Sequence, residues 1–188
     1  MTSHPRRELI PRDETLRLNG TCNAWKDTFL DAAQQWTLLT ENGQVPTPPF
    51  HTELFQQAAD AQRLSHHVLR FTADFAQGPH STTRAGSAVL AHLATASTLS
   101  SHVAPRFLDA AHIALRVSSP TSPTTQRYRE NTLVIEHATA RAYLRRTSEA
   151  LRDAVKELDD HLDLHRFFPT ASLRQSPAQP PKSTGRHR

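Results

Sequence analysis

The longest stretch of the chain without glycine or proline runs from about Thr125 to Phe168, and it constrains the fold more than any other feature. Its apolar residues recur every three or four positions, as they do along the buried face of an α-helix. They are Ile135, Ala138, Ala142, Leu144, Leu151, Val155, Leu158 and Leu162, and His165 ends the same stripe. A single helix of about 44 residues would be about 65 Å long. The rest of the core must then form alongside this helix.

Three earlier segments show the same helical spacing, and glycine or proline follows each of them. These predicted helices cover residues 21–41, 50–77 and 81–117. Their apolar stripes are Cys22, Trp25, Phe29, Ala32, Trp36 and Leu39, then Leu54, Ala58, Ala61, Ser65, Val68, Thr72 and Phe75, then Ala85, Val89, His92, Ala96, Leu99 and Val103. Asn42-Gly43, Gly78-Pro79 and a loop with Pro120 and Pro123 separate the segments, because such residues end helices.

These patterns predict an all-α fold, an up-down-up-down four-helix bundle with long helices and short connections. Proline has no backbone N–H, so we expect the third helix to be kinked or broken near Pro105. We expect residues 1–20 to form an N-terminal arm that is partly ordered at most, and residues 21–168 to form the bundle domain. Residues 169–188 are rich in Pro, Ser and Arg, which predicts a disordered basic tail.

The positive charge of the chain is concentrated at its ends. The net charge is +4, and residues 169–188 alone carry four basic residues and no acid. The predicted bundle is therefore close to neutral and has no net field to attract a polyanion. Nucleic-acid binding through the basic tail is one alternative that this distribution leaves open. A second possible carrier is the set Arg141, Arg145, Arg146 and Arg152, although interspersed acids also fit an ordinary solvated helix face.

Histidine is the unusual residue type, with 12 copies, and His161 and His165 have the spacing of two metal ligands on one helix face. In an antiparallel bundle His92 is a candidate third ligand at the same end of the molecule. Glu157, Cys22, His80, His66, His67 and Asp74 fall toward that end too. A helix-two histidine with a later His-x3-His loosely resembles the metal-binding bundles of the DinB kind, but here the pair lies at the far end of the last helix.

No motif of a known catalytic class is present. Cys22 is the single cysteine, which excludes an internal disulfide and a multi-cysteine metal site, and it falls on an apolar stripe. Nucleophile-elbow, dinucleotide-binding, Walker and zinc-protease patterns are missing. We therefore expect that the protein is not an enzyme and that it has no cofactor. With no long apolar run and no export signal, we expect a cytoplasmic protein without a membrane partner. Arg outnumbers Lys 19 to 3, and Ala, Thr and Leu are abundant, which indicates GC-rich codon usage and a bacterial protein.

Long amphipathic helices often pair with another copy or with another protein. We therefore expect a non-catalytic interaction protein that self-associates or binds a protein partner. The longest helix should be longer than the helices beside it, so part of it is left without an internal partner. Phe167-Phe168 is a possible anchor for a partner. The alternatives are an accessory factor that contacts nucleic acid through its tail, and a histidine-rich bundle that binds a metal or a small ligand at His161, His165 and His92.

Overall fold

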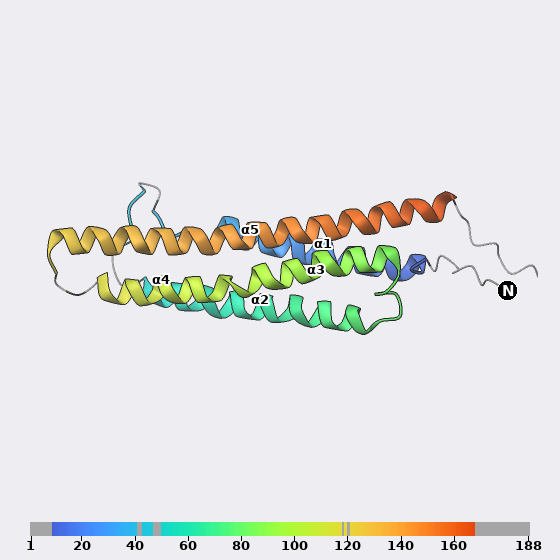
Figure 1. Ribbon diagram of the computed structural model, residues 1–188. Coiled ribbons are helices and arrows are strands. Elements are labelled where there is room, and N and C mark those ends of the chain that lie inside the picture. The colour runs from blue at the N-terminus through green and yellow to red at the C-terminus, as the bar shows by residue number, and fades with distance from the viewer. Residues whose placement is uncertain (1–8, 41–42, 47–49, 118, 120, 168–188) are drawn as a thin grey trace, which may run out of the picture.

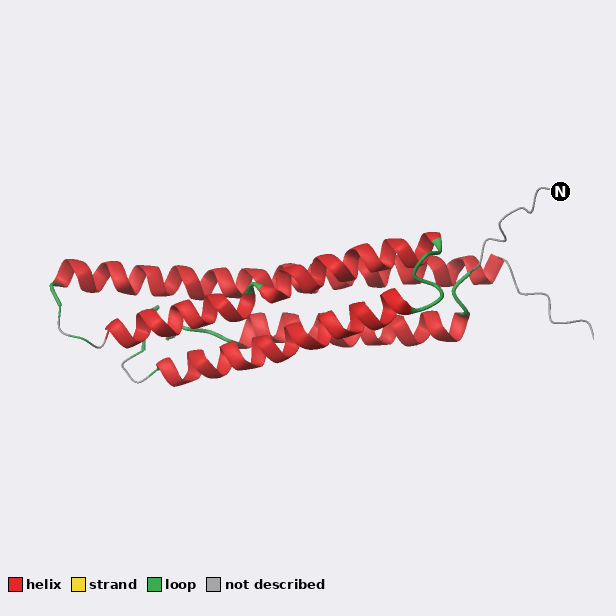
Figure 2. Ribbon diagram, turned by 60° about the horizontal axis from the view of Figure 1, so that its bottom comes forward, coloured by secondary structure: helices red, strands yellow, loops and turns green. Residues whose placement is uncertain are grey.

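The computed structural model describes residues 9–40, 43–46, 50–117, 119 and 121–167. These residues form helices and loops, with no strand among them, so the predicted all-α class is confirmed for this part of the chain. The helices are α1 (Arg12–Gln35), α2 (His51–Gln77), α3 (Arg84–Ser101), α4 (Val103–Val117) and α5 (Pro123–Phe167). They lie side by side along one long axis (Figures 1 and 2).

The long helix α5 organises the molecule. It packs against α1, α3 and α4, while α2 packs against α3 and α4 from the other side. Hydrogen bonds show that α1 runs antiparallel to α5, since Arg141 Nε donates to Ala33 O at 2.8 Å and Ser148 Oγ donates to Lys26 O at 2.9 Å. The α5 residues buried at helical spacing include Leu133, Leu144, Leu151 and Leu158, and every one of these four is 0% exposed.

The predicted third helix is divided near Pro105, at His102. α3 ends at Ser101, α4 begins at Val103, and the two remain nearly in line (Figure 1). Pro105 is therefore the third residue of α4. In the first turn of a helix a backbone N–H has no intrahelical acceptor, so proline costs little there. The break falls before the proline because its missing N–H would otherwise interrupt the ladder of a continuous helix.

The start of the first helix differs from the sequence prediction. α1 begins at Arg12 instead of Thr21, so residues 12–20, predicted as part of a loosely ordered arm, form its first turns. The reason is burial, because Ile10 and Thr15 are 0% exposed and Leu18 is 2% exposed. α1 also ends at Gln35, and the chain beyond it is not helical although Leu38 remains buried.

The sequence prediction selects the wrong face for the first half of α5. Ile135 is 62% exposed and Ala138 is also exposed, although both belong to the predicted apolar stripe. The buried residues are instead Leu133, His137 and Ala140. A histidine at a core position hid the true periodicity, because histidine counts as polar in a hydrophobic pattern. This phase difference leaves an isoleucine on the outer surface of α5.

The tail at residues 169–188 and the first eight residues of the predicted arm lie outside the described residues. The division of the chain into an arm, a bundle domain and a tail, and the up-down-up-down order of a four-helix bundle, stay predictions.

Candidate functional site

The two histidines with ligand spacing meet at the end of the molecule where α1 begins and α5 ends. Their imidazole rings are 5.2 Å apart at an interplanar angle of 87°. Both Nε2 atoms lie within hydrogen-bond distance of the Ile10 carbonyl oxygen, at 3.3 Å for His161 and 2.8 Å for His165. Thr15 Oγ1 donates to the same oxygen at 3.4 Å. The predicted pairing on one face is therefore present, and it holds the backbone that leads into α1.

The surroundings of His161 favour its neutral imidazole. Burial lowers the pKa of His161, and the neighbouring His165 lowers it further, while the Ile10 carbonyl opposes the shift. A neutral imidazole with its proton on Nε2 can donate to Ile10 O. Among the described residues no group of three or more His, Cys, Asp and Glu could hold a metal ion. His92, which is half-buried on α3, therefore does not join the pair as a third ligand.

We expect the double variant His161→Ala/His165→Ala to lower the free energy of unfolding by about 2 kcal/mol, because a carbonyl at a buried position loses two donors. We also expect the metal content of protein purified without chelator to stay unchanged, as measured by elemental analysis. His92→Ala is the control, since it removes a third imidazole from outside the pair. A loss of bound metal together with these two rings would instead support the metal-binding alternative.

Cys22 and the remaining candidate ligands have other surroundings. Burial raises the pKa of the Cys22 thiol to about 12, so it stays protonated and is a poor nucleophile or metal ligand. His80 Nε2 lies 3.2 Å from Glu14 Oε2, and this pair links the α2–α3 turn to α1. His67 stacks on Trp25 with ring centroids 5.4 Å apart. The geometry thus distributes these histidines among separate contacts.

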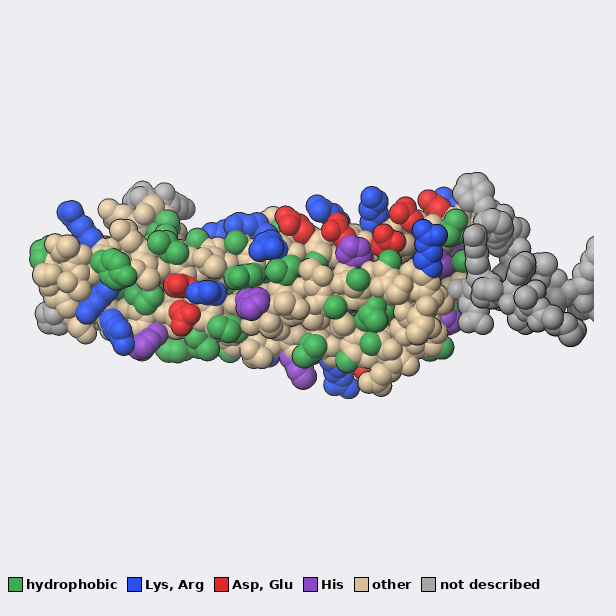
Figure 3. All heavy atoms as spheres, viewed as in Figure 1, with side chains coloured by type: hydrophobic (Ala, Val, Ile, Leu, Met, Phe, Trp, Pro, Cys, Tyr) green, Lys and Arg blue, Asp and Glu red, His purple; other side chains and the backbone are tan. Residues whose placement is uncertain are grey.

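The arginines of α5 do not form one free basic face. Arg141 is half-buried and donates to the backbone of α1, and burial lowers the pKa of its guanidinium. Arg145, Arg146 and Arg152 are exposed, and Arg152 Nε lies 3.6 Å from Asp153 Oδ1. Acidic side chains gather over the C-terminal half of α5 (Figure 3). The surface of α5 therefore carries both signs of charge, and binding of nucleic acid stays a prediction for the tail alone.

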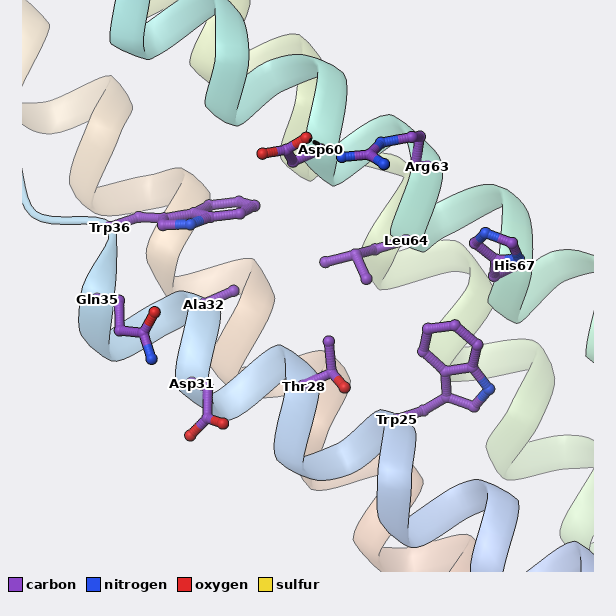
Figure 4. Close-up of a pocket in the computed structure, with 10 residues that line it drawn as sticks. All are labelled: Trp25, Thr28, Asp31, Ala32, Gln35, Trp36, Asp60, Arg63, Leu64 and His67. Atoms are coloured by element: carbon purple, nitrogen blue, oxygen red, sulfur yellow. Dashed lines mark hydrogen bonds and ion pairs between the residues drawn. The ribbon is translucent and has the colours of Figure 1, made fainter.

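An open groove of about 470 Å³ lies between α1 and α2 (Figure 4). It exists because α1 packs on α5 and α2 packs on α3 and α4, whereas α1 and α2 do not approach each other closely. Its apolar surface comes from Trp25, Ala32, Trp36 and Leu64. Its polar lining residues are Thr28, Asp31, Gln35, Asp60, Arg63 and His67.

Each tryptophan of the groove packs against an aromatic ring of another helix. Trp25 stacks on His67 of α2, and Trp36 meets Phe107 edge to face with centroids 5.5 Å apart. Both indoles are only partly buried. The helical spacing of the first segment predicted both tryptophans as core residues, so the groove was not predicted from the sequence. Their spacing of eleven residues, about three helical turns, was the available signal, since it places both on one side of the helix.

No protein-family model, curated protein or solved structure matches this chain. Among the described residues no helix is both long enough and apolar enough to cross a lipid bilayer.

Proposed function

We propose that this chain is a non-catalytic helical-bundle protein, up-down-up-down in topology, that acts by self-association through the outer face of α5. The observation that carries the proposal is a stripe of four exposed residues on α5, Ile135, Arg146, Asp153 and Leu164. Ile135 is 62% exposed and Leu164 is 44% exposed, and Arg146 and Asp153 are exposed as well. The stripe therefore exposes one large apolar side chain at each end and a pair of opposite charges between them.

The four residues share one line along α5 because of their spacing. Eleven residues separate Ile135 from Arg146, seven separate Arg146 from Asp153, and eleven separate Asp153 from Leu164. Eleven residues make about three helical turns and seven make about two, so each residue lies within about 20° of the next around the helix axis. The order of these four residues is the same from both ends in chemical type, apolar at its ends and charged near its middle. Tyr128 and Asp160, each seven residues from a member of the stripe, are also exposed.

This symmetry suits an antiparallel pairing with a second copy. In such a pair, residues meet when their numbers add to a constant, and Ile135 with Leu164 and Arg146 with Asp153 have the same sum. Twofold symmetry forms each contact twice, because a dimer interface of this type places the same surface on both subunits. Opposite charges near the centre select the antiparallel register, and the apolar pairs flank them. The neighbouring Arg152–Asp153 contact is fully on the surface and weak, so it leaves Asp153 available.

A charge-reversal cycle tests this interface. We expect Arg146→Glu to weaken dimerisation by about tenfold or more, because two attractive contacts become repulsive. Asp153→Arg should do the same by placing arginine against arginine. The double variant Arg146→Glu/Asp153→Arg should recover dimerisation, since it exchanges the two signs. Sedimentation equilibrium measures the dissociation constant of each protein.

Arg70→Glu on α2 is the matched control, because Arg70 is an exposed arginine on another helix. Its dissociation constant should equal that of the unchanged protein. A protein that stays monomeric at all accessible concentrations would contradict self-association. A dimer that responds equally to Arg70→Glu and Arg146→Glu, with no recovery in the double variant, would contradict this interface.

A further inference from the structure

The groove between α1 and α2 has the dimensions of an extended peptide. Trp25 lies on α1 and Trp36 directly follows its last residue, so the two are eleven residues apart, a rise of about 16 Å. An α-helix with its side chains is about 10–12 Å wide, and over that length it would fill more than about 1,000 Å³. The groove offers about 470 Å³. A polyproline II segment rises about 3.1 Å per residue, so six residues span nearly the same distance as the two indoles.

The lining of the groove favours a ligand that is rich in proline and carries positive charge. Proline rings pack on exposed aromatic side chains, and proline-rich segments bind aromatic-lined grooves because their extended form is already ordered. Figure 4 shows Trp36 and Leu64 directed into the space between the two helices, with Trp25 beside His67. Asp31 and Asp60 add two carboxylates against the single guanidinium of Arg63, which forms an ion pair with Asp60.

This chain itself contains such a segment. Residues 177–182 read Pro-Ala-Gln-Pro-Pro-Lys, with three prolines and one lysine in six residues. We infer that this segment, Pro177–Lys182, binds in the groove between α1 and α2 of the same molecule. Its prolines lie along the two indoles, and Lys182 lies near a groove carboxylate. Residues 169–188 carry four basic side chains, and the groove lining carries two carboxylates and one guanidinium, so the two charges are opposite.

The connecting chain is long enough for this arrangement. α5 ends at Phe167, at the end of the molecule where α1 begins (Figure 1). Trp25 lies thirteen residues beyond Arg12, about 20 Å along α1. The nine residues from 168 to 176 span up to about 30 Å when extended. The segment therefore enters the groove at Trp25 and continues toward Trp36.

The test uses the two tryptophans, which are the only ones in the chain and both line the groove. The full-length protein is compared with the variant Pro177→Ala/Pro180→Ala/Pro181→Ala/Lys182→Ala by acrylamide quenching of tryptophan fluorescence. We expect the quenching constant of the variant to rise about twofold, because an indole face becomes open to the quencher. Arg186→Ala/Arg188→Ala is the matched control, since it removes tail charge outside the segment and should quench like the unchanged protein.

Two further measurements make the result decisive. A synthetic peptide of residues 175–184, added to the quadruple variant, should restore the lower quenching constant, and a peptide with alanine for each proline should not. Protection in the full-length protein should be independent of protein concentration, because the contact is intramolecular. Equal quenching of the two proteins, an inactive peptide, or protection that is lost on dilution would each overturn the inference. A small molecule retained in the groove and detected by native mass spectrometry would also overturn it.

Discussion

Substituting Gly86→Ala should destabilise the protein by about 3 kcal/mol or more, because no methyl group fits at this position. A Cβ atom on Gly86 would overlap the carbonyl oxygen of His80 and lie 2.8 Å from its carbonyl carbon. Thr83 Oγ1 would be only 2.9 Å away. These atoms belong to the turn before α3, where Thr83 also accepts the Gly86 N–H at 3.0 Å. The backbone of the turn would have to move, and the contact between His80 and Glu14 would move with it.

Gly20→Ala is the matched control for this substitution. Gly20 lies within α1, and a Cβ there meets no atom within 4 Å. Alanine should therefore stabilise the protein by about 0.5–1 kcal/mol, because glycine is the poorer helix former. Urea unfolding followed by circular dichroism measures both variants. Equal stability of Gly86→Ala and the unchanged protein would contradict the close packing of the α2–α3 turn.

Acidification should remove about 3 kcal/mol of stability between pH 6.5 and pH 4 through His137 alone. His137 is 3% exposed, packs edge to face on Phe107 at 5.3 Å, and its Nε2 has no partner among the described residues. Burial lowers the pKa of His137 to about 4, and the charge of Arg141 contributes to the shift. In the unfolded chain His137 binds a proton near pH 6.5, whereas in the folded chain it binds one only near pH 4. The contribution of His137 to the free energy of unfolding is therefore fully present above pH 6.5 and is lost as the pH falls toward 4.

His137→Leu should remove this part of the pH dependence while leaving stability at pH 7 unchanged or higher. The leucine is apolar and of similar size, and it replaces a ring nitrogen that lacks a hydrogen bond. His112→Leu, on the exposed surface of α4, is the control and should keep the pH profile of the unchanged protein. Urea unfolding at a series of pH values gives the profile. Because burial lowers the pKa of His161 too, a smaller acid-dependent loss should remain in His137→Leu. If the free energy of unfolding of His137→Leu falls with pH as steeply as that of the unchanged protein, the role of His137 is contradicted.

The helices themselves follow from local sequence. For α2 the predicted bounds of 50–77 agree with the observed His51–Gln77, and every residue of its predicted stripe is buried. The reason is that α2 has an unbroken apolar repeat between proline and glycine, so local spacing and helix-ending residues act together. The start of α1 was missed because its charged first turn resembles a surface arm, although Leu18 and Thr15 extend the buried stripe backwards.

The faces and the site needed the tertiary structure. Along the first half of α5 apolar residues occur on both sides, so periodicity alone did not decide between the face of Ile135 and the face of Leu133 and His137. Similarly, the spacing of His161 and His165 predicted that the rings share a face, but only packing placed the Ile10 carbonyl between them.

The sequence by itself determined that the chain forms long helices and where α2 begins and ends, because backbone propensity and side-chain period act over a few residues. Tertiary structure decided which side of the first half of α5 is buried and how far α1 extends toward the N-terminus, because burial depends on neighbours that are distant in the sequence. The groove between α1 and α2 is the clearest case. Each tryptophan is an apolar residue at helical spacing, and only the separation of the two helices leaves the indoles open.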